Sequence, residues 1–141
     1  MKFFKKLFKP EQPPELRIEI EDVGELEWDK ESEYWVGTHN GIKFSVAYDG
    51  LSRPGEELSS LVVHTLANPD FPQNIMRKIK ELAKSQYTAE RHDEIDALVP
   101  QDVVFQSPSF ILIQFFGPKD SEPFWFAEIH ENEKIYVGFD T

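Results

Sequence analysis

The run YWVGTHNGIKFSVAY, residues 34–48, decides the fold of this chain. Asn40-Gly41 lies between two strand-like runs, and this dipeptide is the strongest short-range signal for a two-residue β-hairpin turn. Such a turn fixes which residues face each other across the two strands. Trp35 then belongs to the core, and Gly37 leaves room for the ring of Phe44. The expected cross-strand pairs are His39 with Ile42, Gly37 with Phe44, and Trp35 with Val46.

Further strands and helices are expected on both sides of this hairpin. Residues 16–20 and 25–28 have the pattern of strands, and so do residues 102–106, 109–116, 123–130 and 134–139. Between these blocks, Pro54 marks the start of one helix, and Asp70 is expected to cap a second that runs to about Gln86. Residues 88–98 form a third helix or an extension, which Pro100 closes. The order predicts an α+β fold: a mainly antiparallel sheet of an N-terminal and a C-terminal meander, with two or three central helices packed on one side.

Length and charge indicate an acidic, single-domain protein. The chain has 141 residues, a net charge of −11 and no cysteine. We expect one domain over residues 15–141, preceded by a basic tip and a Pro-rich connector over residues 1–14. The lack of cysteine excludes disulfides and thiolate chemistry, and the start of the chain lacks the pattern of a secretory signal, so we expect a cytoplasmic protein. The acidic balance argues against nucleic acid as a partner.

Acidic residues are concentrated early in the chain. Nine of them lie from Glu15 to Glu33, and only Arg17 and Lys30 oppose them. They mostly alternate with apolar residues, which is the pattern of strands with one charged face. One interpretation is a docking surface for a basic protein, and the other is a solvated outer face that guards an edge strand. The candidate partner-binding residues are Glu19, Glu21, Glu25, Glu27, Asp29 and Glu31.

The first nine residues carry the opposite charge. Phe3, Phe4, Leu7 and Phe8 recur at helical spacing, with lysines on the other side. This pattern suits contact with a membrane surface, and it equally suits a frayed start or a turn packed on the domain, because so short a helix is marginal in water. No run in the sequence approaches the roughly 20 apolar residues of a transmembrane span.

No motif in the sequence identifies a reaction, so we assign no catalytic residue and expect no cofactor and no metal. No two histidines stand three or four residues apart, and glycine-rich phosphate loops and nucleophile elbows are absent from the sequence. Three polar residues nevertheless stand out. Gln114 and Glu128 each interrupt an apolar strand, and a carboxylate there must be paired or open to a cleft. His92 stands four residues before Asp96 on a predicted helix, where the two side chains can meet.

Each of these polar residues also has a structural interpretation. Glu128 can lie on a partly covered strand face, and His92 can belong to an ordinary helix-surface pair. The functional alternative is a small enzyme with a cleft that holds Glu128 and a histidine. A deep pocket around these groups favours the enzyme, whereas a flat acidic sheet favours a binding protein.

The motifs Gly24-Glu25-Leu26-Glu27-Trp28 and Trp35-Val36-Gly37 precede the Asn40-Gly41 turn. With the closing runs Phe124-Trp125-Phe126 and Ile135–Asp140, they resemble small bacterial sheet-and-helix domains of unknown function. The resemblance covers residues 16–141 and implies no catalytic residues. Several such domains are associated with toxin-immunity proteins, which are often acidic proteins that block a basic nuclease.

The sequence therefore favours a non-enzymatic binding module, immunity-like by this resemblance, that uses its acidic face on a basic protein partner. A small enzyme and a peripheral membrane adaptor are the alternatives.

Overall fold

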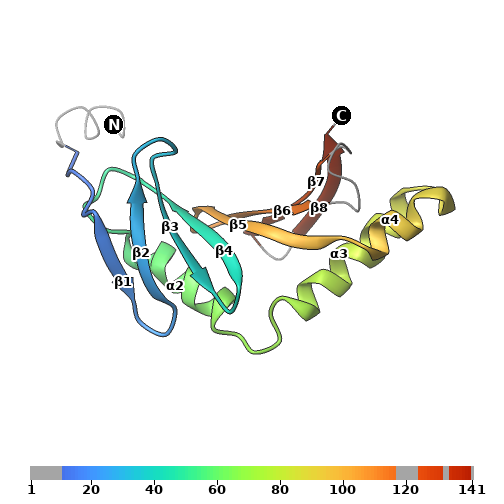
Figure 1. Ribbon diagram of the computed structural model, residues 1–141, viewed down its shortest axis with the longest axis horizontal. Helices are drawn as coiled ribbons and strands as arrows, with labels where there is room; N and C mark the ends of the chain where they lie inside the picture. Colours follow the sequence, from blue (N-terminus) through green and yellow to red (C-terminus); the bar gives the residue numbers. More distant parts are fainter. Residues whose placement is uncertain (1–10, 117–123, 132–133, 141) are drawn as a thin grey trace.

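The computed structural model describes residues 11–116, 124–131 and 134–140, and it shows one eight-stranded sheet and helices (Figure 1). The first four strands are β1 (Arg17–Ile20), β2 (Gly24–Asp29), β3 (Tyr34–His39) and β4 (Ile42–Ala47). The last four are β5 (Val99–Ser107), β6 (Phe110–Phe116), β7 (Phe124–His130) and β8 (Lys134–Asp140). The α+β class and the mostly antiparallel sheet are as predicted.

The strands lie in the sheet in the order in which they follow in the chain, from β1 to β8. Neighbouring strands are antiparallel except β4 and β5, which are parallel and bring Phe44 beside Val103 and Val46 beside Phe105. A parallel pair needs a long crossover, and the helical segment between the two blocks provides it. The joint between β4 and β5 is apolar, because all four of these side chains are at most 1% exposed.

The crossover consists of α2 (Glu56–Leu66), α3 (Gln73–Gln86), the short 3₁₀ turn η1 (Ala89–Arg91) and α4 (His92–Asp96). Their apolar residues recur every three or four positions, so that each of the three α-helices buries one side in the core. α2 contacts β5, and α3 contacts β8. The buried helix residues are Leu58, Val62, Leu66, Met76, Ile79, Ala83 and Ile95.

Three predicted boundaries in this crossover are wrong. α2 begins at Glu56 with Gly55 as its N-cap, so Pro54 lies just before the helix. α3 begins at Gln73, and Asp70 makes no side-chain cap bond. The amide of Asp70 instead donates to the Asn68 side chain at 2.9 Å, so the turn at Asn68 extends past the expected cap. Pro100 does not close the helical region, because it already lies inside β5. The pairing of β5 with β4 starts only at Asp102, so the missing N–H of Pro100 leaves no gap in that ladder.

The hairpin of β3 and β4 has the predicted register, with Trp35 opposite Val46 and Gly37 opposite Phe44. Trp35 is fully buried, and its indole N–H donates to the backbone carbonyl of Glu15 at 2.9 Å. The ring of Trp28 lies edge-on to Trp35, with the ring centroids 5.2 Å apart. Such edge-to-face pairs add to the free energy of burying the rings. The hairpin thus anchors both β2 and the segment before β1.

The strands β1 and β2 have one apolar and one charged face, because successive side chains point to opposite sides of a sheet. Ile18, Ile20 and Leu26 belong to the buried core, together with residues of α2. The alternate positions lie on the opposite face and are exposed. These positions are Arg17, Glu19, Glu25, Glu27 and Asp29.

The predicted membrane-contacting tip, with Phe3, Phe4, Leu7 and Phe8, lies outside the described residues. Residues 11–14 of the predicted connector pack against the loop that follows β4. The amide of Gln12 donates to the carbonyl of Gly50 at 2.8 Å, and the Tyr48 hydroxyl donates to the carbonyl of Gln12. In the described part of the chain, no helix has the length and apolar character needed to cross a membrane.

The close approach of β3 to its neighbours generates a first prediction. A Cβ atom at Gly37 would lie 3.0 Å from the Phe44 ring and 3.1 Å from the carbonyl oxygen of Glu25. We predict that Gly37→Ala lowers the free energy of unfolding by about 1–3 kcal/mol, because the Glu25 carbonyl belongs to the sheet backbone and cannot move aside. Chemical denaturation measures this change.

Gly55→Ala is the matched control, because a Cβ atom there meets its nearest neighbour, Leu51, at an ordinary 3.7 Å. We expect this control to stay close to the wild type in stability. A Gly37→Ala protein that is as stable as the control would contradict the packing described for the hairpin.

Candidate functional site

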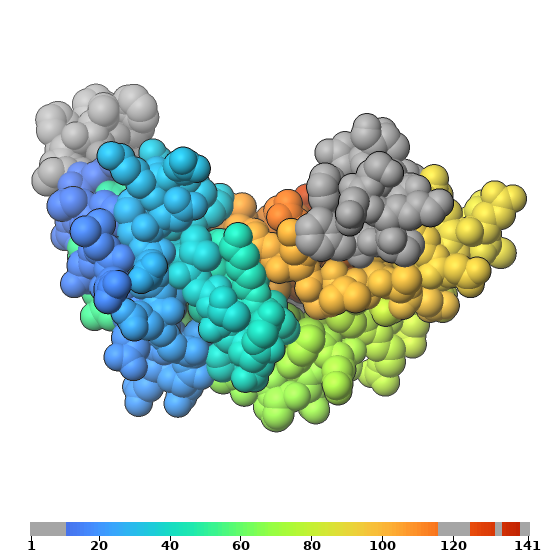
Figure 2. Space-filling model, viewed as in Figure 1, coloured from blue at the N-terminus to red at the C-terminus, as the bar shows by residue number. Residues whose placement is uncertain are grey.

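The six predicted partner-binding residues lie on β1, on β2 and in the turns that follow these strands, and all six are exposed. Figures 1 and 2 show this part of the molecule (blue) at the opposite end from α4 (yellow). Glu19 and Glu25 face each other across the β1–β2 pair. We call the six residues the acidic surface: Glu19, Glu21, Glu25, Glu27, Asp29 and Glu31.

Arg17 lies among these carboxylates and pairs with two of them. Its guanidinium is 3.8 Å from Glu25 and 3.2 Å from Glu27. The three side chains are 62–72% exposed, so water screens these contacts and they contribute little to stability. The acidic surface therefore keeps most of its negative charge available to another molecule.

Asp29 has its own hydrogen bonds at the end of β2. The Ser32 hydroxyl donates to its carboxylate at 2.8 Å, and the Glu31 amide donates at 3.2 Å. These two bonds hold the pKa of Asp29 below its ordinary value. Asp29 consequently stays charged to a lower pH than a carboxylate without such donors.

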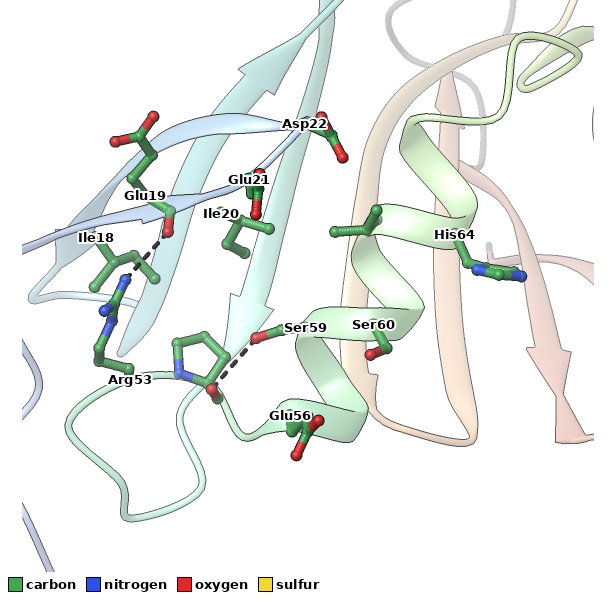
Figure 3. Close-up of a pocket in the computed structure, with 12 residues that line it drawn as sticks. Ile18, Glu19, Ile20, Glu21, Asp22, Arg53, Glu56, Ser59, Ser60 and His64 are labelled. Carbon is green, nitrogen blue, oxygen red and sulfur yellow. Dashed lines mark hydrogen bonds between the residues drawn. The ribbon is translucent and has the colours of Figure 1, made fainter.

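A cleft of about 590 Å³ lies between β1 and α2 (Figure 3). Ile18, Ile20 and Val63 provide apolar surface in it. In Figure 3, the side chain of Asp22 points toward α2, whereas His64 points away from β1. Four carboxylates and one guanidinium line the cleft, so it continues the negative charge of the acidic surface. The polar lining residues are Glu19, Glu21, Asp22, Arg53, Glu56, Ser59, Ser60 and His64.

Arg53 lies at the edge of this cleft and binds the segment around β1. One of its terminal nitrogens donates to the backbone carbonyl of Glu19 at 3.1 Å, and its Nε lies 3.2 Å from the carboxylate of Glu15. The loop that carries Arg53 runs beside residues 12–15, because the Glu15 amide donates to the carbonyl of Ser52 at 2.9 Å. Sequence reasoning missed Arg53 and the cleft, since Arg53 and Glu19 are 34 residues apart.

Glu128 lies beside a histidine at the surface of β7. Its carboxylate is 3.2 Å from Nε2 of His130, and each side chain is 35% exposed. Both residues line an open recess with Lys134 and Tyr136. The His130 ring stands edge-on to Phe110 and Tyr136, with centroid distances of 4.7 and 5.2 Å. Glu128 is thus a partly covered strand residue with a hydrogen-bonded partner.

Gln114 is exposed. The residue with a shifted pKa is its partner on the neighbouring strand, Asp102. Asp102 in β5 pairs in register with Gln114 on one side and with Lys43 on the other. Burial raises the pKa of Asp102 above its ordinary value, while the charge of Lys43 opposes this effect. Within the described residues, Oδ1 of Asp102 is buried and has no hydrogen-bond partner. Sequence reasoning missed Asp102, because its burial depends on the long-range pairing with β4.

His92 bonds to the end of α3 rather than to Asp96. Its Nε2 lies 3.2 Å from the carbonyl of Lys84 and 3.3 Å from that of Tyr87. Asp96 is instead 2.5 Å from Nζ of Lys84, and this hydrogen bond holds the pKa of Asp96 below its ordinary value. Both contacts tie α4 to α3, which is a structural role for the polar residues of this helix.

The buried position of Asp102 leads to a prediction on pH. A carboxyl group with a raised pKa binds its proton more tightly in the folded state than in the unfolded state. Its contribution to stability therefore falls as the pH rises from the ordinary value of 3.8 through the raised value. Asp102→Asn removes this penalty, and we expect its Tm at pH 7 to exceed that of the wild type by about 1–3 °C, because the group is only half-buried.

The gain should shrink as the pH falls towards 4, because the raised pKa leaves a larger protonated fraction of Asp102 in the folded state than in the unfolded state. Thermal melts of both proteins at the two pH values measure the difference. A variant that is less stable than the wild type at pH 7 would contradict this description of Asp102.

Comparisons with protein-family models, with curated proteins and with solved structures found no match to this chain. Within residues 11–116, 124–131 and 134–140, no three histidine or acidic side chains gather closely enough to hold a metal ion. The resemblance carried by the Gly24–Trp28 and Trp35–Gly37 motifs stays a prediction.

Proposed function

We propose that this protein is a non-enzymatic, cytoplasmic binding module whose acidic surface docks on a basic protein. The observation that supports this function best is the set of six exposed carboxylates on two adjacent strands and their turns, where Arg17 pairs with only two of them. Such a concentration of charge raises the rate at which a basic partner arrives and disfavours acidic competitors. In the toxin-immunity role that the resemblance implies, the partner is a basic toxin.

The expected arrangement of the sheet is part of this proposal. Two meanders with the helices packed on one side leave the other face of the sheet for a partner. The charged residues of β1 and β2 lie on the face opposite the core, already exposed, so docking requires no rearrangement of packed side chains. The mechanism is steric and electrostatic occlusion of the partner's own site.

Reversing charge on β2 tests the proposal. We expect Glu25→Lys combined with Glu27→Lys to weaken binding of the basic partner at least about tenfold, because the partner then meets repulsion instead of attraction. Raising NaCl from about 50 to about 300 mM should weaken wild-type binding steeply, because the Debye length shortens. A quantified pull-down from lysate, followed by titration of the captured protein, measures both effects.

Glu81 and Glu90 provide the matched control. Both are exposed, they lie in α3 and η1, and their reversal to lysine changes the net charge equally. Glu25→Gln with Glu27→Gln removes the same two carboxylates and their ion pairs with Arg17 without adding positive charge, so it separates loss of attraction from repulsion. Thermal melts show whether each variant is folded. The proposal would be contradicted if the control variant weakened binding equally. It would also be contradicted if neither salt nor charge reversal on β2 changed the affinity.

A small enzyme is the second candidate, and the hydrogen bond between Glu128 and His130 favours it. A carboxylate bonded to an imidazole can orient the ring for acid–base chemistry. The recess around the pair is open to solvent, so we expect no turnover of generic ester or phosphate substrates above background. The enzyme would be established instead if the wild type turned over such a substrate and His130→Gln lost this activity while keeping the wild-type Tm.

A further inference from the structure

The outward side of β1 presents backbone groups in a regular pattern. The amide of Trp28 donates to the carbonyl of Leu16 at 2.9 Å, and Arg17 faces Glu27 in the register. Hydrogen-bonded and non-bonded pairs alternate along an antiparallel ladder. The backbone N–H and C=O of Ile18 therefore point toward β2, as do those of Ile20. The backbone groups of Arg17 and Glu19 point away from the sheet.

Few of the described residues bond to these outward groups. Before β1, the loop after β4 takes the outer position, where Glu15 donates to Ser52 at 2.9 Å. Beyond that point the loop continues into α2. Among the described residues, the contact that remains on the outward side of β1 is the Arg53 side chain, which donates to the Glu19 carbonyl at 3.1 Å. In the described part of the chain, the outward amides of Arg17 and Glu19 have no backbone partner. Edge strands with such unpaired groups are templates for a further strand.

The cleft lies directly beside this edge (Figure 3). An extended segment paired with β1 places alternate side chains on the two faces of the sheet. One set enters the cleft, beside Ile20 of β1 and Ser59 and Val63 of α2, which suits small apolar side chains. The other set lies over the acidic surface, next to the Glu19 carboxylate, which suits lysine or arginine.

We propose that β1 accepts an extended basic segment of the partner protein as an added strand beside α2. This inference rests on the proposed function and specifies how the partner binds. The partner chemistry follows from charge complementarity, because the carboxylates of Glu19, Glu21, Asp22 and Glu56 surround the position of the added strand. Backbone hydrogen bonds supply affinity in this mode, and the alternating side chains supply specificity.

The test uses a fluorescein-labelled hexapeptide of alternating lysine and valine, with binding followed by fluorescence anisotropy. Glu19→Pro removes the outward amide of β1 without touching the ladder to β2, and proline is tolerated on the outward side of an edge strand. We expect it to weaken binding about tenfold or more, and Glu19→Gln, which keeps the amide, to weaken it less. Circular dichroism melts establish that both variants are folded.

Arg53→Ala uncovers the carbonyl of Glu19 and should strengthen binding of the hexapeptide several-fold. Arg77→Ala is its matched control, because it changes the net charge equally and, among the described residues, the Arg77 guanidinium bonds to the Asn74 side chain and not to β1. Equal gains in the two variants would show a charge effect alone and would overturn the added strand. A hexapeptide N-methylated at the amides that face β1 should bind at least about tenfold more weakly than the unmethylated peptide.

The outcomes separate this inference from the proposed function. If reversal of Glu25 and Glu27 weakens binding of the hexapeptide while Glu19→Pro and N-methylation do not, the acidic surface binds the partner but β1 adds no strand. If none of these changes matters, both proposals are wrong. A concentration-dependent dimer that Glu19→Pro breaks would overturn the added strand as well, because a second copy of the chain would then occupy the edge.

Discussion

The parallel pairing of β4 with β5 holds the two halves of this protein in one sheet. The joint is made by Phe44, Val46, Val103 and Phe105, whose side chains are at most 1% exposed. The rings of Phe44 and Phe105 meet edge-on, with their centroids 6.3 Å apart. A parallel joint requires a crossover, and here the crossover supplies the helices that complete the core. Among the described residues, β1 and β8 each pair with a single strand, so they are the two edges of the sheet. The position of β1 at an edge is thus a consequence of how β4 is paired.

This topology brings two properties together at one end of the molecule. The acidic surface lies on β1 and β2, and the outward backbone groups of Arg17 and Glu19 lie along the same strand. Negative charge on an edge strand opposes non-specific pairing with other chains, most of which are not basic. In the proposed function the same charge attracts a basic segment, so one arrangement would both protect the edge and select the partner. Arg53 reduces both properties, because it neutralises part of the negative charge and covers the backbone carbonyl of Glu19.

Local features of the fold were predictable, because their signals lie within a few residues. The Asn40-Gly41 turn set the register of β3 and β4, down to the pairing of Gly37 with Phe44. The alternation of acids with apolar residues identified which side of β1 is exposed. The β4–β5 joint has no such local signal, because any two apolar strands can pair. For the same reason the sequence did not reveal the perturbed Asp102, the cleft or the contact of Arg53 with Glu19, all of which depend on segments distant in the chain.

The central claim is that β1 is an open edge in the free protein. Amide hydrogen exchange of the isolated protein, resolved by NMR, measures this directly without any ligand. We expect slow exchange for Ile18 and Ile20, whose amides bond to β2, and fast exchange for Arg17 and Glu19, whose amides point outward. Uniformly slow exchange along β1 would mean that the edge is already covered, and it would contradict the account.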